Sequence, residues 1–376
     1  MIFRILFGAL VFIGFFSCNP NSNKDQSYQN EESLDLLKFK AESTSSHQKN
    51  IVLVSGDEEY RSEEVLPQLA AMLSKNHGFN CTVLFAQDPS QPGIVDPNYT
   101  QNIPGMEHLE SADLMILFTR FRDLPDEQME HIENYLQTGK PVLAIRTATH
   151  AFNVKDTTSR WYQWGNFHQD SDSPWHEGFG RLVLGERWYT HHGHHKHQST
   201  RGVIADGASD HPLTNGIEDG EIWGPTDVYG VRLPLPGDSK PIFLGQVVNR
   251  VDTFNENDLF FGMQPSDTEL AKSNPASRTN YDPNDPLMPI AWTKSYQLPE
   301  GEKGVAFTST IGSSTDFLNE GVRRLMINAS YYLMDLTVPD KVDADIVGKF
   351  NPSPYSFHTD EYWEEKNLVI SELRPK

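Results

Sequence analysis

The chain has 376 residues, of which 37% are hydrophobic and 11% aromatic, and its formal net charge is −21 at pH 7. The apolar and aromatic content is typical of a folded protein, and the length allows one large domain or two of ordinary size. The acidic balance argues against nucleic acid or an anionic membrane surface as a ligand, because both attract a basic face.

The N-terminus is predicted to be an export signal. Met1 to Arg4 form a short positive region, and Ile5 to Phe16 is an apolar stretch too short to remain as a spanning helix. In Phe15-Phe16-Ser17-Cys18 a small residue precedes a cysteine, which resembles a bacterial lipobox. We therefore expect a signal peptide over 1–17, acylation of Cys18 and a lipid-anchored place in the cell envelope. A plain signal peptide or an anchoring helix is the alternative.

Residues 18–48 are rich in Asn, Ser, Gln and charge, and this composition predicts a flexible tether. If Cys18 is acylated, Cys81 has no partner for an intramolecular disulfide. Cys81 begins an apolar run, so we expect it to be a buried core residue rather than a nucleophile.

From Asn50 the chain alternates short apolar runs with stretches of helical spacing. Strands are predicted over 51–54, 81–86, 114–118 and 141–145, and helices over 66–73 and 125–136. This alternation predicts right-handed βαβ units, and therefore an α/β fold with a parallel sheet that carries helices on both faces.

The rhythm changes after His150. Residues 151–230 are rich in Trp, His, Gly and Asp, and we interpret them as a long insertion over the edge of the sheet. Its tryptophans could build a core or stack on sugar rings; they are Trp161, Trp164, Trp175, Trp188 and Trp223. Further strands are predicted over 241–248, 289–292 and 304–309, a helix over 320–336 and an irregular extension over 339–376. One elaborated domain, 49–338, is expected.

Ligands of an open parallel sheet bind beyond the carboxyl ends of its strands. Charged and polar residues follow three of the predicted strands at this edge. The predicted catalytic residues are Glu58, Glu59, Tyr60, Arg146 and His150. The predicted substrate-binding residues at the same edge are Arg120, Arg122, Thr147 and Thr149. A histidine can transfer protons near neutral pH, and an arginine can stabilise a developing oxyanion.

Five of the fourteen histidines lie within the seven residues 191–197. In an extended segment, residues two apart share a face, so His192 with His194, or His195 with His197, could chelate one divalent ion such as zinc. These four histidines are the predicted metal ligands. The alternative without a metal is that the imidazoles hydrogen-bond sugar hydroxyls and one of them acts as a general base.

Three segments together resemble the ThuA-like family, named for trehalose utilisation. They are Gly56-Asp57-Glu58-Glu59-Tyr60-Arg61, Arg146-Thr147-Ala148-Thr149-His150-Ala151-Phe152, and the histidine run ending Ser199-Thr200-Arg201-Gly202. The resemblance extends over roughly Asn50 to Leu336 and includes Asp227-Val228-Tyr229-Gly230. It implies a flavodoxin-like fold related to the class I glutamine amidotransferases and a role in disaccharide or glycoside catabolism. From these motifs we expect Arg201, Asp227 and Tyr229 to bind substrate.

The chain departs from the amidotransferases at the nucleophile. Those enzymes place a cysteine on the turn after a strand, and this chain has Arg146 at or near that position. Because arginine stays charged and is not a nucleophile, amide hydrolysis through a thioester is excluded.

The predicted function is that of a lipid-anchored carbohydrate-active enzyme. It would hydrolyse, eliminate or isomerise (keto-)disaccharides or glycosides, with a partner sugar dehydrogenase supplying oxidised substrates. The alternative is a non-catalytic carbohydrate-binding lipoprotein.

Overall fold

The computed structural model describes residues 1, 35–42 and 47–376. The expected cleavage site and Cys18 lie outside the described residues. Within them, no helix combines the length and the apolar character needed to cross a bilayer.

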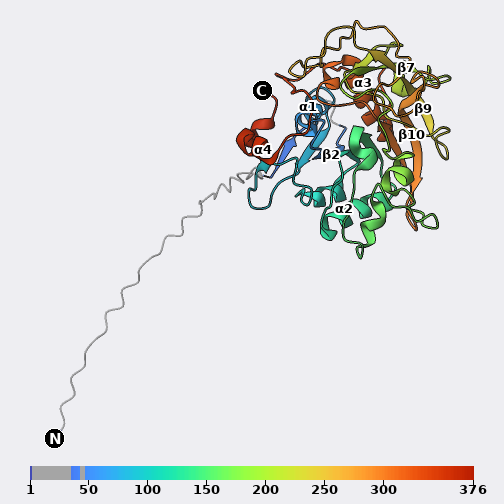
Figure 1. Cartoon of the computed structure of the whole chain (residues 1–376). Helices are drawn as coiled ribbons and strands as arrows, with labels where there is room; N and C mark the ends of the chain where they lie inside the picture. The colour runs from blue at the N-terminus through green and yellow to red at the C-terminus, as the bar shows by residue number, and fades with distance from the viewer. Residues whose placement is uncertain (2–34, 43–46) are drawn as a thin grey trace. The chain divides into compact units, whose positions relative to one another are not determined.

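A ten-stranded mixed sheet is the centre of the fold (Figure 1), with the order β1-β3-β2-β5-β6-β11-β10-β9-β7-β8. A separate two-stranded sheet joins β4 to β12. The strands are β1 Leu36–Phe39, β2 Asn50–Gly56, β3 Asn80–Phe85, β4 Ile94–Val95, β5 Leu114–Thr119, β6 Val142–Ile145, β7 Gln198–Ile204, β8 Ile222–Gly224, β9 Lys240–Asn249, β10 Met288–Gln297, β11 Lys303–Ser309 and β12 Leu368–Val369.

Half of the large sheet is parallel. Strands β3, β2, β5, β6 and β11 pair in parallel. Numbered by their order in the chain, these five have the spatial order 2-1-3-4-5, which is that of flavodoxin-like folds. The central strand β5 is buried along its whole length, which explains its continuous apolar run. The predicted α/β class and its parallel sheet are therefore confirmed.

The other half of the sheet is antiparallel, which the sequence analysis did not predict. Strands β10, β9, β7 and β8 continue it beyond β11. Because β7 and β8 come from residues 151–230, this segment supplies part of the sheet and is not only an insertion over its edge. Strand β7 begins Gln-Ser-Thr-Arg, so it lacks the apolar alternation by which a strand is recognised.

Residues at both ends of the domain are also more ordered than expected. Leu36–Phe39, in the predicted tether, form β1, which pairs antiparallel with β3 and buries three of its four side chains. The predicted irregular extension contains α4 Asp360–Lys366 and buries Tyr355 and Trp363 completely or nearly so. Apolar side chains at these places bury against the domain, which outweighs the polar composition around them.

Helices cover both faces of the parallel strands, as predicted. Helices α1 Ser62–Lys75 and α3 Glu320–Leu333 pack on one face, and α2 Asp126–Gln137 packs on the other. The shorter helices are η1 Met106–Ser111, η2 Arg146–His150, η3 Arg160–Trp164, η4 Gly180–Leu184, η5 Pro212–Thr214, η6 Asp316–Leu318 and η7 Ile370–Leu373.

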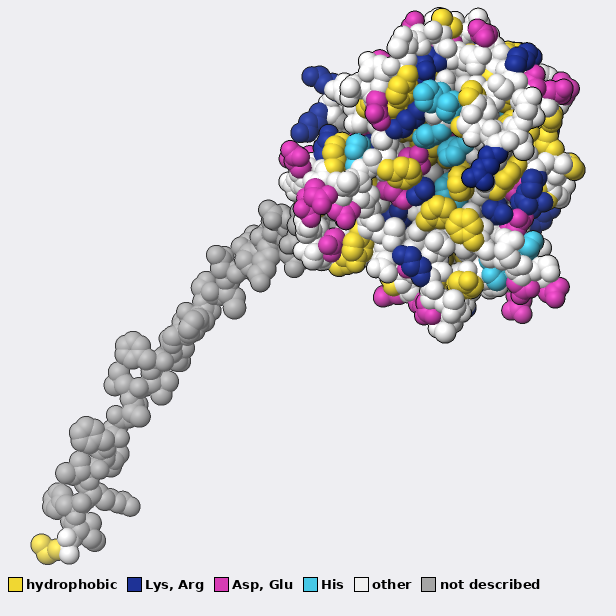
Figure 2. All heavy atoms as spheres, in the orientation of Figure 1, with side chains coloured by type: hydrophobic (Ala, Val, Ile, Leu, Met, Phe, Trp, Pro, Cys, Tyr) yellow, Lys and Arg dark blue, Asp and Glu magenta, His cyan; other side chains and the backbone are white. Residues whose placement is uncertain are grey.

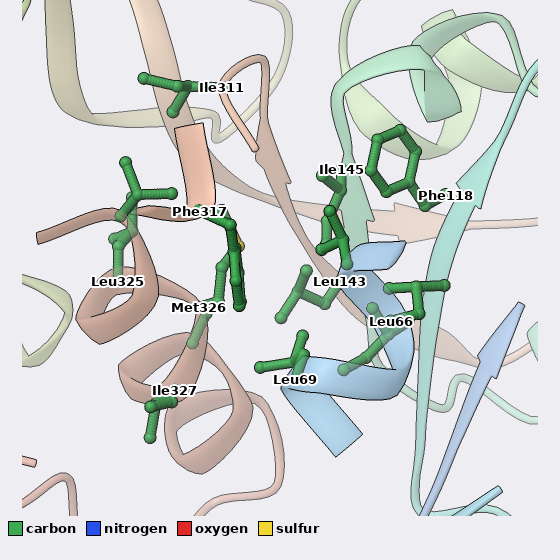
Figure 3. Packing of buried hydrophobic residues seen from close by; sticks show 14 of the residues in the cluster. Leu66, Leu69, Phe118, Leu143, Ile145, Ile311, Phe317, Leu325, Met326 and Ile327 are labelled. Carbon is green, nitrogen blue, oxygen red and sulfur yellow. The ribbon is translucent and has the colours of Figure 1, made fainter. Parts of the chain in front are cut away.

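Strand β6 shows how one strand serves both cores. Leu143 and Ile145 point to the α1/α3 face (Figure 3), whereas Val142 and Ala144 belong to the α2 core. This alternation follows from the two-residue period of a strand. The α2 core also takes in most of the predicted tryptophans, and the rings of Trp164 and Trp175 stack 4.5 Å apart.

We expect Leu143→Ala to lower the free energy of unfolding by about 2–5 kcal/mol, because Leu143 is fully buried and its truncation leaves a cavity between α1, α3 and the sheet. Urea denaturation followed by circular dichroism measures the change. Leu233→Ala is the matched control, since that side chain is 46% exposed and should cost little. Equal effects of the two substitutions would contradict this packing.

Candidate functional site

Four strained residues surround the carboxyl edge of the parallel strands. Arg61, Phe121 and Arg146 follow β2, β5 and β6, and Lys196 precedes β7; all four have φ between 46° and 64°. A non-glycine residue in this left-handed region costs about 1–2 kcal/mol. Strain of this kind persists where the surrounding structure requires it, and it is concentrated at functional sites.

The centre of the site is the buried carboxylate of Asp227. Its Oδ2 accepts a hydrogen bond from Nδ1 of His191 at 2.8 Å, and its Oδ1 accepts one from Nδ1 of His195 at 3.0 Å. The Nη2 of Arg146 donates to the same Oδ1 at 3.1 Å. Burial acts to raise the pKa of Asp227, but the charge of His191 and these hydrogen bonds outweigh it and hold the pKa well below its usual value. Both imidazoles therefore use Nδ1 on Asp227 and keep Nε2 for other partners.

His191 and His195 reach Asp227 because the histidine run is not extended. The backbone N–H groups of His192 and Gly193 both donate to the carbonyl of Val228, which holds the start of the run beside Asp227. The chain then turns, with the N–H of His197 donating to the carbonyl of His194 at 2.9 Å. Histidines four residues apart consequently share one side, and the expected pairing of residues two apart is wrong.

The other predicted metal ligands point to separate partners. Nε2 of His192 lies 2.9 Å from the carbonyl of Pro283. His194 stacks on His197 at 4.2 Å, and Arg250 donates to Nδ1 of His197 at 3.1 Å. Of the predicted set only His195 is at the centre. Among the described residues, the group that could hold a metal ion is His191, His195 and Asp227, whose ligand atoms lie within 4.8 Å of one another.

Glu59 supplies a second carboxyl group beside the two imidazoles. Its Oε1 lies 3.4 Å from Nε2 of His195, and its Oε2 lies 3.8 Å from Nε of Arg120. Burial and then the charge of Asp57 raise the pKa of Glu59 to about 7, against the opposing charges of Arg120, Arg146 and His191. A carboxyl group with such a pKa can give or take a proton near neutral pH.

Asp57 fixes the backbone at Glu59 through hydrogen bonds. Its Oδ1 accepts hydrogen bonds from the backbone N–H groups of Glu59 and Tyr60, and its Oδ2 accepts one from the hydroxyl of Thr147 at 2.6 Å. This carboxylate therefore ties the loop after β2 to the turn after β6. Thr147 was expected to bind substrate, but its hydroxyl donates this internal hydrogen bond to Asp57.

Arg146 is an internal support and not a surface group. Its side chain is fully buried, and Nη1 donates to the carbonyls of Asp227 at 2.8 Å and Thr310 at 2.6 Å. The guanidinium carbon lies 4.4 Å from the ring of Tyr60 and 3.8 Å from the ring of Tyr229. The expected oxyanion-stabilising role of Arg146 does not fit this burial. Arg146 acts on the site through Asp227, whereas the rings of Tyr60 and Tyr229 pack against His195 and His191.

Three further predicted residues are engaged within the protein. Glu58 forms ion pairs with Arg120 and with Nη2 of Arg122, the latter at 2.6 Å. Arg122 is fully buried and also donates to the carbonyls of Pro97 and Tyr99. A catalytic role for Glu58 and a substrate-binding role for Arg122 are therefore not supported by their geometry.

Arg201 does not reach the site. It projects from β7, and its guanidinium donates to backbone carbonyls of Gly220, Pro265 and Asp267. These contacts fasten surface loops to the antiparallel half of the sheet. The expectation that Arg201 binds substrate is therefore not supported by its geometry.

His150 lies at the site as a neutral imidazole. Its ring is packed 4.8 Å from the ring of Phe121 and 5.1 Å from that of Trp188, and its Nδ1 lies 3.2 Å from the hydroxyl of Thr149. Burial first, and then the charges of Arg120 and Arg146, hold the pKa of His150 well below its usual value. It can donate or accept a hydrogen bond without carrying charge.

A cavity of about 640 Å³ opens over His191 and His195. Figure 2 shows histidines gathered on one face of the molecule, with hydrophobic and basic side chains beside them. Aromatic rings and small polar groups line the cavity together, and no carboxylate is among the lining residues. The lining consists of Trp188, Tyr189, Thr190, His191, His192, Gly193, His195, Asn274, Ala276, Ser277, Arg278, Thr279 and Tyr281.

The structure also shows which residue takes the place of a cysteine nucleophile at the turn after β6. Arg146 occupies the strained turn after β6, with φ of 48°. Cys81 is buried in β3, and burial raises the pKa of its thiol. Cys81 is therefore a core residue, as predicted, and the described residues hold no cysteine at this site.

The raised pKa of Glu59 gives a test of the site through stability. Because folding disfavours its ionised form, the stability that depends on Glu59 is complete below pH 4.5 and is lost as the pH rises through about 7. We therefore expect Glu59→Gln to be more stable than wild type by up to about 3 kcal/mol near pH 8, and equally stable near pH 4.

Urea unfolding of the wild type and the variant across this pH range measures the difference. The control is Glu110→Gln, since the Glu110 side chain is 71% exposed and should show no such dependence. A constant difference between Glu59→Gln and wild type at all pH values would contradict the raised pKa.

No family model matches the sequence, and no curated protein matches it. Among solved structures, the chain is similar to a protein from Parabacteroides merdae ATCC 43184 described as thua-like, with 14% sequence identity and a TM-score of 0.39. The similarity covers 83% of this chain and 98% of that chain.

Proposed function

We propose that this chain is a ThuA-like carbohydrate-active enzyme that transfers protons at a carbon next to a sugar carbonyl. One observation supports this most directly. The buried carboxyl group of Glu59, with a pKa of about 7, lies 3.4 Å from one of two imidazoles that share a buried carboxylate. A proton-transfer group is thus in contact with His195, and His195 and His191 line the cavity with defined orientations.

The cavity supports a sugar as the substrate. Its volume of about 640 Å³ is within the range of small-molecule sites. The rings of Trp188, Tyr189 and Tyr281 can pack against the apolar face of a pyranose. Hydroxyl and amide groups on the same walls can hydrogen-bond the sugar hydroxyls.

The proposed reaction begins with a keto sugar, whose carbonyl acidifies the neighbouring C–H bond. The carboxylate of Glu59 accepts the proton from carbon, and the electron pair of that bond moves to the carbonyl oxygen to form an enolate. To isomerise the sugar, the enolate oxygen takes up a proton and the hydroxyl on the neighbouring carbon loses one, while Glu59 returns its proton to the former carbonyl carbon. Expelling a group from the next carbon instead is an elimination, in which the leaving group takes up a proton. Water can later add to the unsaturated product, and elimination followed by addition amounts to hydrolysis.

The two imidazoles stabilise the enolate oxygen in this scheme. Burial alone would lower the pKa of His191, but the charge and hydrogen bond of Asp227 outweigh it and raise the pKa. His191 can therefore present a charged Nε2–H to a developing oxyanion. This role replaces the one expected of Arg146.

A divalent ion at the same group is the alternative to a charged His191, because an imidazole nitrogen that binds a metal carries no proton. His191 and His195 each donate Nδ1–H to a carboxylate, which is the usual second contact of a metal-binding imidazole. An ion held there would supply a Lewis acid that polarises the carbonyl oxygen.

We also propose that the enzyme acts in the bacterial cell envelope, anchored by a lipid on Cys18. Oxidised substrates would come from a sugar dehydrogenase. The motif at residues 15–18 supports the anchor, and the −21 net charge supports the absence of nucleic-acid ligands.

We expect Glu59→Gln to lower kcat on 3-keto disaccharides by about 10²–10⁴-fold, because the amide cannot take the proton. Asp227→Asn should lower kcat as well, since it removes the charge that orients both imidazoles. Incubation with 3-keto and unoxidised disaccharides, followed by mass spectrometry of the products, measures turnover. Glu110→Gln is the matched control.

Full turnover by Glu59→Gln would refute the assignment of the base. If the wild type binds these sugars but converts none of them, the chain is the binding lipoprotein of the alternative hypothesis.

The metal is tested separately. We expect the wild type, dialysed against zinc or manganese and then against buffer, to retain one ion, and His191→Ala to bind it at least about tenfold more weakly. His211→Ala is the control, because His211 packs on Tyr332 outside the group. Elemental analysis gives the stoichiometry. Equal retention by wild type and His191→Ala would remove the ion from this site.

A further inference from the structure

Three phenylalanines from distant parts of the chain form a row at the same edge of the sheet, which we call the phenylalanine row: Phe167, Phe121 and Phe357. Phe167 is 56% exposed and Phe357 is 52% exposed, whereas Phe121 is half-buried between them. Phe121 follows β5, Phe167 belongs to residues 151–230, and Phe357 belongs to the C-terminal extension. The fold thus brings three separate segments together to present aromatic rings to solvent.

Ring contacts make the row continuous. Phe121 and Phe167 stack with centroids 5.6 Å apart and an interplanar angle of 27°. The guanidinium of Arg120 lies 4.7 Å from the ring of Phe121 and 4.8 Å from that of Phe357, so it bridges the gap between them. The result is a continuous series of ring contacts, with one guanidinium between Phe121 and Phe357.

The phenylalanine row lies next to Glu59, the proposed catalytic residue. Nε of Arg120 lies 3.8 Å from Oε2 of Glu59, and the ring of Phe121 lies 4.8 Å from that of His150. None of the three phenylalanines lines the 640 Å³ cavity over His191 and His195. Glu59 therefore lies beside two distinct surfaces, the cavity and the row.

Folding alone does not account for the row. Two half-exposed phenyl rings leave apolar surface in water, which is unfavourable. Phe121 has φ of 46°, a left-handed conformation that is costly for a large side chain. Its N–H donates to the carbonyl of His150 at 2.9 Å, which holds the strained residue in place. Strain combined with exposed aromatic rings beside a site indicates a ligand-binding role.

The size of the row indicates a small occupant. A phenylalanine can bury roughly 150–250 Å², so two half-exposed rings and part of a third offer on the order of 300 Å². A stable protein interface needs about 800 Å² from each partner. A single pyranose ring, which has one apolar face, matches an area of this order.

We propose that the phenylalanine row is a second sugar subsite, which binds the ring linked to the one held in the cavity. This inference rests on the proposed function and narrows its substrate class to disaccharides and longer glycosides. In the elimination that breaks the glycosidic bond, the row would hold the departing ring while Glu59 takes the proton from the sugar in the cavity.

The test measures binding, so that it does not depend on turnover. Affinities of glucose, trehalose and cellobiose for the full-length Glu59→Gln protein are measured by calorimetry, with and without Phe167→Ala and Phe357→Ala. The double alanine variant is expected to weaken at least one disaccharide by about tenfold and to leave the affinity for glucose within about twofold. Phe167→Tyr, which keeps an aromatic face, should restore most of the loss from Phe167→Ala. Leu233→Ala is the control for removing an exposed apolar side chain.

Equal losses for glucose and both disaccharides, or no loss for any sugar, would overturn the second subsite. So would a wild-type protein that binds neither disaccharide. Row-dependent binding of a disaccharide in a protein without turnover would support the subsite and refute only the enzymatic function. If the double alanine variant changes neither turnover nor the affinities, the enzymatic function is supported and the second subsite is refuted.

Discussion

The buried negative charge of Asp227 is the constraint on which the site depends. A carboxylate removed from water is strongly destabilised unless charged and hydrogen-bonding groups compensate it, and here Arg146, His191 and His195 do so together. Each compensating group acquires a fixed orientation in return. The two imidazoles are held by Nδ1, and the guanidinium is enclosed between two tyrosine rings. The contacts that compensate the charge of Asp227 therefore also orient His191 and His195, which line the cavity.

A second buried carboxylate, Asp57, sets the position of Glu59. It gathers the N–H groups of the loop after β2 and the hydroxyl of Thr147 after β6. Asp57 and Asp227 therefore hold other groups in place, while the carboxyl group of Glu59 lies beside His195. Burial and the charge of Asp57 raise the pKa of Glu59 toward neutrality. Strained backbone at Phe121 and Arg146 completes the edge, and the N–H of Phe121 donates to the carbonyl of His150 in η2.

The parallel half of the fold could be predicted because its strands are continuous apolar runs, such as 114–118, bounded by polar turns. The carboxyl-end rule then located Glu59, His150 and Arg146 at the correct edge. The same reasoning assigned catalytic roles to Arg146 and Tyr60 because it could not foresee their burial. His191 was missed as a central residue because an extended spacing was assumed where the chain turns at His194. Strand β7 was missed because its hydrogen bonds, and not an apolar alternation, place it in the sheet.

By itself, the sequence determined the α/β class, the edge of the sheet that carries the polar residues, and the absence of a cysteine nucleophile after β6. These properties follow from local patterns, namely apolar periodicity and the identity of residues next to strand ends. Tertiary structure alone decided which histidines meet, that Asp227 is shared between them, and that the C-terminal extension places Phe357 against Arg120. Such pairings depend on contacts between segments far apart in the chain, and burial then sets which charged groups are held inside and which remain free to act.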